Sequence, residues 1–341
     1  MASNDLPEVA GSLPHGTFAT GCGAGWRFRH GVSIQRMSLH RAFATFASLV
    51  FLMSSSPARA DASNHELASY YDRHMALEAG VAYGWAGRGE PRRMRAGVVQ
   101  VGVGKDAYFA LLADGTLLVW ADVPEAATTL MRGAARFAAG DSGWLAIDGA
   151  GVLWHGTATT GAAPKRVAEG VVAACVGDSA DYYITRDGRL YARGLAHRGQ
   201  YGDGRLTATA DFVATASEAV AVRAHTGHAV HLRRDGVVMG TGGNRFGPLS
   251  SHGLGDKADR WGRLFDGAVA IATGSRHTLA IRADGGLWAW GEGFAIEPAK
   301  LFDNVVAVAA GDTATIARTA DGALWQWDGG GRAPRRLTLR Q

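Results

Sequence analysis

Cysteine is almost absent from this chain. Its 341 residues include only Cys22 and Cys175, and Cys175 ends the apolar stretch that begins at Val171. A framework of several disulfides is therefore excluded, and stability must come from packing. In an apolar run a thiol is expected to be a small buried side chain rather than a reactive group.

The chain also lacks an apolar run long enough to cross a membrane. The run 42–53 is too short for a bilayer core of about 30 Å. It follows a short n-region that starts at Met37 and precedes the small-x-small sequence Ala58-Arg59-Ala60, which is typical of a signal peptide. We expect residues 1–36 to be a non-native or unstructured leader and residues 37–60 to be a signal peptide. Cleavage near Ala60 would export residues 61–341 to the periplasm or the medium.

A lasting excess of positive charge is missing as well. The full chain has 35 Lys and Arg against 31 Asp and Glu. Residues 1–60 hold five arginines and two acids, so the mature chain keeps 30 basic and 29 acidic residues. A protein that binds phosphate backbones needs a basic excess or a basic stripe. We therefore expect no nucleic-acid partner.

Signatures of catalysis and metal binding are absent too. Gly140-Asp141-Ser142-Gly143 resembles the nucleophile segment of a trypsin-like protease, but it is in phase with Gly177-Asp178-Ser179-Ala180. Asp and Ser favour such repeat turns because their side chains bond to nearby backbone. His225, His228 and His231 are spaced by three, which alternates faces along a strand. We expect no catalytic residue, no metal and no cofactor.

Glycine is abundant, with 48 residues, and much of it belongs to one repeated phrase. A glycine is followed by nine residues and then by Asp-Gly, or once Ala-Gly, before an apolar strand. Full copies end at Gly115, Gly151, Gly188, Gly285 and Gly322, a copy that begins with His225 ends at Gly236, and an abbreviated copy surrounds Gly80. The gaps between these glycines are 35, 36, 37, 48, 49 and 37 residues. Regular periods of this length indicate stacked or radial repeats.

Each copy predicts a β-hairpin, because glycine adopts a positive φ at low cost and Asp-Gly favours tight turns. Short strands at regular spacing, separated by glycine-rich turns, predict an all-β propeller. The strand after each hairpin has large apolar residues at adjacent positions, such as Leu287 and Trp288. Adjacent residues face opposite sides of a sheet, so these strands are expected to be buried between neighbouring blades.

A fourth strand is indicated by proline followed by basic and aliphatic residues. This pattern occurs at Pro91, Pro164 and Pro298, and once more at Pro334 near the C-terminus. We interpret the last copy as a strand that completes an incomplete N-terminal blade and closes the ring, which protects sheet edges. The prediction is a seven-bladed β-propeller with shortened repeats, with six blades as the alternative.

Three stretches resemble the regulator of chromosome condensation repeat family. Residues 193–204 are similar to the family's long Gly-Gln turn, and residues 242–249 repeat that turn. Residues 274–280 match its Gly-x-x-His-Thr-x-Ala segment. The resemblance covers about residues 70–340 and implies a seven-bladed propeller. Its members include a nuclear nucleotide-exchange factor, a plant ultraviolet-B receptor and secreted inhibitors of β-lactamase, so the fold does not select a function.

We expect a monomeric, exported, non-enzymatic binding propeller that engages a protein partner. The two long repeats predict loops at 195–216 and 243–266, and extra loops often form a working surface. Arginine and aromatic residues dominate interface hot spots. The predicted partner-binding residues are Arg198, Tyr201, Arg245, Phe246 and Trp261. A carbohydrate-binding or cell-wall-binding propeller is the first alternative, and a hydrolase or lyase on a propeller scaffold is the second.

Overall fold

The structure is a computed structural model that describes residues 66–141, 143–157, 162–250, 255–328 and 333–340. The predicted leader and signal peptide lie outside the described residues. The described chain consists of 28 strands and one 3-10 helix, η1 (Pro124–Ala126). No helix within this part of the chain is long and apolar enough to span a membrane.

The strands form seven antiparallel sheets of four strands each, and each sheet is one blade. Blade 1 contains β1 (Leu67–Tyr70), β2 (Arg73–Glu78), β3 (Val81–Ala86) and β4 (Arg92–Ala96). Blade 2 contains β5 (Val98–Val103), β6 (Tyr108–Leu112), β7 (Leu117–Trp120) and β8 (Thr128–Met131). Blade 3 contains β9 (Ala134–Ala139), β10 (Trp144–Asp148), β11 (Leu153–Gly156) and β12 (Lys165–Ala168).

The remaining four blades follow in chain order. Blade 4 contains β13 (Val171–Val176), β14 (Ala180–Thr185), β15 (Leu190–Gly194) and β16 (Thr209–Ala216). Blade 5 contains β17 (Ala219–Ala224), β18 (His228–Arg233), β19 (Val238–Gly243) and β20 (Lys257–Phe265). Blade 6 contains β21 (Ala268–Thr273), β22 (His277–Arg282), β23 (Leu287–Gly291) and β24 (Ala299–Phe302). Blade 7 contains β25 (Val305–Ala310), β26 (Thr315–Thr319), β27 (Leu324–Trp327) and β28 (Arg335–Leu337).

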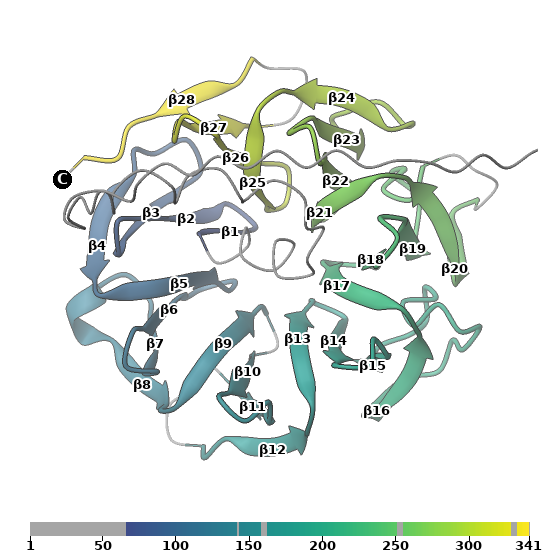
Figure 1. The fold of residues 1–341 in the computed structure, drawn as a ribbon, viewed down its shortest axis with the longest axis horizontal. Coiled ribbons are helices and arrows are strands. Elements are labelled where there is room, and N and C mark those ends of the chain that lie inside the picture. Colours follow the sequence, from purple (N-terminus) through teal and green to yellow (C-terminus); the bar gives the residue numbers. More distant parts are fainter. Residues whose placement is uncertain (1–65, 142, 158–161, 251–254, 329–332, 341) are drawn as a thin grey trace, which may run out of the picture. The chain divides into compact units, whose positions relative to one another are not determined.

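The blades are arranged as a closed ring around a central axis (Figure 1). The first strand of each blade contacts the first strand of the next, and β25 of blade 7 contacts β1 of blade 1. The prediction of seven blades is confirmed, and the six-bladed alternative is wrong.

The repeated glycines are the turn residues between the second and third strands. Six of them have φ between +81° and +84°, and Gly80 has φ +77°. In the turn of blade 2, the carboxylate of Asp114 accepts a hydrogen bond from the amide of Thr116 at 2.9 Å. Aspartate recurs because its carboxylate accepts a hydrogen bond from a turn amide, and glycine recurs because it adopts the left-handed backbone conformation of the turn.

The core is divided among the junctions between blades. Seven clusters of buried residues occur, and each joins one pair of neighbouring blades. Leu287 lies in the cluster between blades 6 and 7, and its neighbour Trp288 packs against the cluster between blades 5 and 6. This confirms that the third strands are covered on both faces, as in a stack of repeats whose units pack on their neighbours.

The predicted mode of ring closure is wrong. Strand β28 pairs with β27 and completes blade 7, while β4, which follows Pro91, already completes blade 1. Blades 7 and 1 instead meet through a backbone hydrogen bond from Asp312 to the carbonyl of Tyr71 at 3.0 Å and through side chains. Trp85 donates to Gln326 at 3.0 Å, and Gln326 and Arg335 donate to the carbonyls of Gly87 and Gly89, each at 2.9 Å.

Candidate binding face

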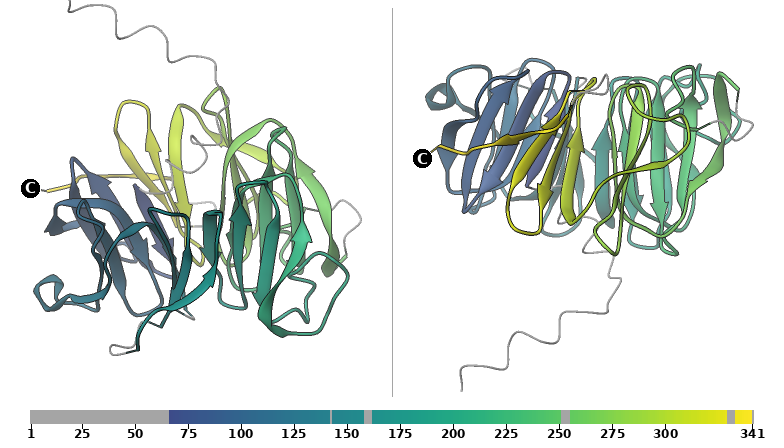
Figure 2. Two further views of the ribbon diagram at one scale, coloured as in Figure 1. Left: turned by 60° about the horizontal axis from the view of Figure 1, so that its bottom comes forward. Right: turned by 90° about the horizontal axis from the view of Figure 1, so that it is seen from above.

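The strands of every blade run between the two ends of the ring (Figure 2). Because neighbouring strands are antiparallel, connections from first to second and from third to fourth strands lie at one end, which we call the loop face. The Asp-Gly turns lie at the other end, the hairpin face. The two longest connections from third to fourth strands, residues 195–208 of blade 4 and 244–256 of blade 5, are therefore both on the loop face.

These loops are shorter than the sequence predicted. Residues 209–216 and 257–265 belong to β16 and β20, which have eight and nine residues, whereas the other fourth strands have three to five. The long repeats thus contain both a longer loop and a longer outer strand. The third-to-fourth loops have 14 and 13 residues in blades 4 and 5, against five to eight elsewhere.

The blade 4 loop is fixed from within. The side chain of Gln200 accepts a hydrogen bond from the amide of Arg198 at 2.9 Å, and its carbonyl accepts one from Tyr182 at 2.7 Å. Tyr201 donates to the carbonyl of Gly194 at 2.6 Å. The turn therefore holds Arg198 at its exposed edge, beside the first turn of blade 5.

The blade 5 loop is fixed by Asn244 and by the neighbouring blade. Asn244 donates to the carbonyl of Ser250 at 2.8 Å and accepts from the amide of Leu249 at 2.8 Å. Thr278 and Trp290 of blade 6 both donate to the carbonyl of Pro248 at 2.8 Å. Residues 251–254 of this loop lie outside the described residues.

The two loops meet around a cavity of about 650 Å³, which we call the loop-face cavity. Three predicted residues, Arg198, Arg245 and Phe246, line it together. Phe246 is 42% exposed, a high value for an aromatic side chain. The structure therefore brings together residues from two separate breaks in the repeat period.

The other two predicted residues do not line this cavity. Tyr201 is 0% exposed in the core between blades 4 and 5, so it has no surface to offer a partner. Trp261 is half-buried and packs edge-on against His231, with ring centroids 4.4 Å apart. The prediction of Tyr201 as a surface contact is therefore wrong, whereas that of Trp261 stays a prediction outside this cavity.

Sequence reasoning missed several residues of the cavity, which come from shorter turns. Arg276 stacks over the ring of Phe246 at 4.4 Å and pairs with Glu292 at 2.8 Å. The hydrogen bond with Glu292 raises the pKa of Arg276. The charged side chains that line the cavity are Arg198, Arg245, Lys257, Arg276, Asp256 and Asp312. Positive charge therefore prevails at the cavity, and Arg198, Arg245 and Lys257 form no ion pair within the described chain.

Beside this cavity, a polar cluster spans the ring axis. Tyr70, from the end of β1, donates a hydrogen bond to one oxygen of Asp178 on the far side of the ring. The other oxygen accepts from Tyr71 at 3.2 Å and from Thr226 at 2.9 Å. Burial, together with the negative charge of Asp178, raises the pKa of Tyr71 to about 12 and that of Tyr70 further. Both tyrosines therefore remain hydrogen-bond donors at neutral pH.

His225 completes this cluster. Its ring stacks on Tyr70 with centroids 4.7 Å apart, and its Nδ1 lies 3.2 Å from the hydroxyl of Ser275. Burial lowers the pKa of His225, although the charge of Asp178 opposes the shift. His225, His228 and His231 do not gather around one point, and the described residues contain no group of three or more His, Cys, Asp or Glu side chains placed to hold a metal.

The sequence model of the regulator of chromosome condensation (RCC1) repeat matches residues 268–294, which span β21, β22 and β23 of blade 6. Blade 6 of this seven-bladed propeller therefore resembles an RCC1 repeat. No curated protein matches it in sequence.

Solved structures show the same fold. A chain in the structure of Kap60 bound to yeast RCC1 (Prp20) matches with TM-score 0.67 and 16% identity, over 89% of this chain and 91% of that one. Prp20p from Saccharomyces cerevisiae, described with its binding to Gsp1p and histones, matches with TM-score 0.60 and 16% identity, over 72% and 80%. The CRINKLY WD40 ectodomain of the Arabidopsis thaliana receptor kinase ACR4 matches with TM-score 0.55 and 14% identity, over 81% and 98%.

Proposed function

We propose that this RCC1-like propeller is an exported, non-enzymatic interaction protein that holds a protein partner at the loop-face cavity. The observation that carries the proposal is the convergence of the two longest loops on one cavity of about 650 Å³. The cavity exposes Phe246 between Arg245 and Arg276. Arginine and aromatic side chains in such a setting are typical anchors of protein interfaces.

The charge of the cavity favours an acidic segment of the partner. Arg198, Arg245 and Lys257 have no carboxylate partner within the described residues, and carboxylates are the groups that an arginine fork binds best. Complementary charge raises the rate of encounter and selects among partners. The structures of RCC1 (Prp20) with Kap60 and of Prp20p support protein binding on this fold, but at 16% identity they do not identify a partner for this chain. No observation favours the carbohydrate-binding or hydrolase alternative.

Export is part of the proposal. Cleavage near Ala60 would leave every described strand intact, because β1 begins at Leu67. The single cysteine of the propeller, Cys175, is buried and makes no disulfide. The propeller therefore needs no disulfide bond to fold in an oxidising compartment. The test is intact-mass analysis of the protein recovered from the periplasm and the medium. A first residue at Asp61 is expected, and a chain retained in the cytoplasm with residues 37–60 present would contradict export.

The binding test uses the mature chain as bait, with a partner identified by quantitative mass spectrometry. Arg245→Ala combined with Phe246→Ala should reduce capture at least tenfold, because it removes an anchor and a cation from the cavity. The control combines Arg189→Ala and Val306→Ala, which removes one exposed arginine and one exposed apolar side chain at the hairpin end of the ring. Raising the salt concentration should weaken capture by the wild type. Equal capture by both double variants, or none by the wild type, would overturn the proposal.

A further inference from the structure

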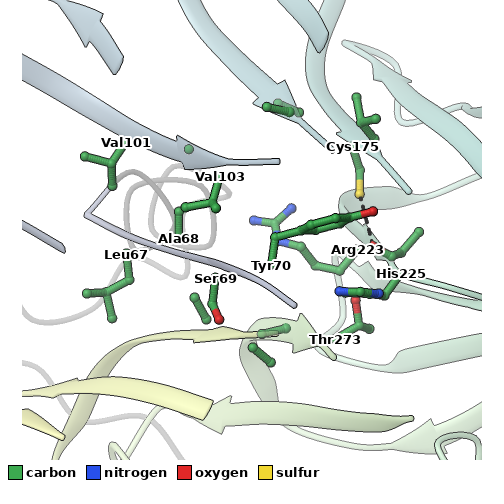
Figure 3. Close-up of a pocket in the computed structure, with 18 of the residues that line it drawn as sticks. Leu67, Ala68, Ser69, Tyr70, Val101, Val103, Cys175, Arg223, His225 and Thr273 are labelled. Carbon is green, nitrogen blue, oxygen red and sulfur yellow. Dashed lines mark hydrogen bonds between the residues drawn. The ribbon is translucent and has the colours of Figure 1, made fainter. Parts of the chain in front are cut away.

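A second cavity, of about 170 Å³, lies on the ring axis and is lined by the first strands of all seven blades (Figure 3). We call it the axial cavity. It shares no lining residue with the loop-face cavity. Its walls are mostly small and apolar, so the few polar groups that reach it determine what it can hold.

The side chain at one equivalent wall position differs among the blades. The pairing of the first and second strands identifies this position in each blade. In every blade the residue before the last of the first strand pairs with the second or third residue of the next strand, as Arg223 does with Val230. Six of these seven positions carry small residues, namely Ser69, Gly102, Ala138, Cys175, Ala272 and Ala309. Arg223 is the exception. The small neighbours leave room for its side chain, which reaches into the cavity beside Tyr70 (Figure 3).

The positive charge of Arg223 has no negatively charged partner among the residues that line the cavity. Arg223 is the only Asp, Glu, Lys or Arg among the lining residues, and no carboxylate pairs with it in the described part of the chain. Its Nη1 donates to the carbonyl of Val222 at 2.6 Å, which leaves other N–H groups of the guanidinium free for a ligand. Arg223 is half-buried. An unpaired, partly desolvated cation is costly, and a bound anion would remove that cost.

Two further polar groups stand next to Arg223. His225 is 3% exposed, and its Nε2 is buried without a hydrogen-bond partner. Thr273, at the end of β21, adds a hydroxyl to the wall of the cavity. Figure 3 shows both side chains on the same side of the cavity as Arg223. When Ser275 donates to Nδ1 of the neutral His225 ring, Nε2 carries the proton and becomes a donor.

The size of the cavity limits the ligand. One water molecule has about 30 Å³ in the liquid, so 170 Å³ is room for a few water molecules. Pockets for drug-sized ligands measure about 300–1,000 Å³. A peptide or a sugar is therefore too large, whereas an ion with a few oxygen atoms fits.

We propose that the axial cavity binds one small oxyanion, of the phosphate, sulfate or carboxylate class, with Arg223 as its charged ligand and His225 and Thr273 as hydrogen-bond donors. An arginine fork matches two oxygens of such an ion. This site is separate from the proposed protein-binding site, and either can exist without the other.

The test measures the unfolding midpoint of the full propeller while phosphate, sulfate or acetate replaces chloride at constant ionic strength. The wild type should gain about 2–4 °C once the preferred anion exceeds its dissociation constant several-fold. The three salts separate a tetrahedral from a planar ligand. Arg223→Met keeps most of the side-chain length and should lose this gain. Arg245→Met, at the loop-face cavity, should respond like the wild type.

Phosphate and sulfate also stabilise proteins generally by exclusion from the surface. That effect appears in all three proteins, so an equal gain in the wild type and in Arg223→Met would overturn the proposal. A measurement on the wild type alone removes any dependence on the folding of the variant. If phosphate or sulfate gives the larger gain, crystals soaked in selenate should show one anomalous peak beside Arg223, and an axial cavity without selenium would equally overturn the proposal.

Discussion

At the scale of single residues, polar side chains help to hold blades 7 and 1 together. Every other pair of neighbouring blades is joined directly by the chain. Arg318 of blade 7 is buried and donates from Nη2 to the carbonyl of Leu77 at 2.8 Å. It also pairs with Glu78 of blade 1. No strand crosses this junction, so such contacts, one backbone hydrogen bond and one apolar cluster hold the ring closed.

We predict that Arg318→Met lowers the free energy of unfolding by about 1–3 kcal/mol, because the half-buried carbonyl of Leu77 loses its donor. Arg189→Met is the matched control. Arg189 is an exposed arginine that pairs with Asp187 within one hairpin, and its loss should change stability by less than about 0.5 kcal/mol. Urea denaturation of the three proteins measures both effects. A similar small effect in both variants would show that Arg318 does not stabilise the closure.

At the scale of elements, the sequence predicted the features that recur in every blade and missed the ring closure, which occurs once. The seven hairpins and the apolar columns follow from turn chemistry and strand alternation. The closure was wrong because a periodic sequence does not mark where a unit begins, so the strand after Pro91 could belong to either neighbouring hairpin. The short first strand, residues 67–70, carries no turn glycine of its own to announce it.

The candidate site shows the same limit. Arg198, Arg245 and Phe246, which line the loop-face cavity, were predicted because they lie where the period breaks. Tyr201 lies in the same break, but its hydroxyl is satisfied by the carbonyl of Gly194, and a sequence does not show that burial. The contact of Tyr70 with Asp178 joins residues 108 positions apart across the axis, where no local pattern applies.

Substituting alanine for hairpin glycines can separate the cost of a left-handed backbone from the cost of steric crowding. Gly322 and Gly285 have φ values of +84° and +81°, but a Cβ at Gly322 would meet nothing within 4 Å, whereas one at Gly285 would lie 3.2 Å from the Cα of Asn304. Asn304 is itself held at φ +58° and has little freedom to move. We predict that Gly322→Ala costs about 1–2 kcal/mol from conformation alone and that Gly285→Ala costs more. Urea midpoints compare the two, and an equal or smaller loss for Gly285→Ala would rule out the crowding.

At the scale of the whole molecule, buried histidines link stability to pH. Burial lowers the pKa of His74 and His231 to about 4 and the pKa of His228 and His277 to about 3. In the unfolded chain these rings have a pKa near 6.5. Between about pH 6.5 and 4 the unfolded state therefore binds more protons than the folded state, and stability must fall as the pH falls.

Turn aspartates act in a lower range. Hydrogen bonds from the amides of Thr116 and Val237 lower the pKa of Asp114 and Asp235 below the ordinary 3.8. Their stabilising contribution is complete above that value and is lost as the pH falls below it. A loss of stability that begins near pH 6.5 therefore belongs to the histidines.

We predict that the free energy of unfolding is nearly constant above pH 7 and falls steadily between pH 6.5 and 5, by on the order of 1–2 kcal/mol for each of these four buried histidines. Urea denaturation at half-unit steps of pH measures the slope. His231→Gln should reduce the slope by about one proton, since it removes one titrating ring, whereas His197→Gln, at an exposed position, should leave the slope unchanged. A wild-type profile that stays flat from pH 7 to 5 would mean that the buried rings take up protons in the folded state, and the closed packing of the blade junctions around them would then be wrong.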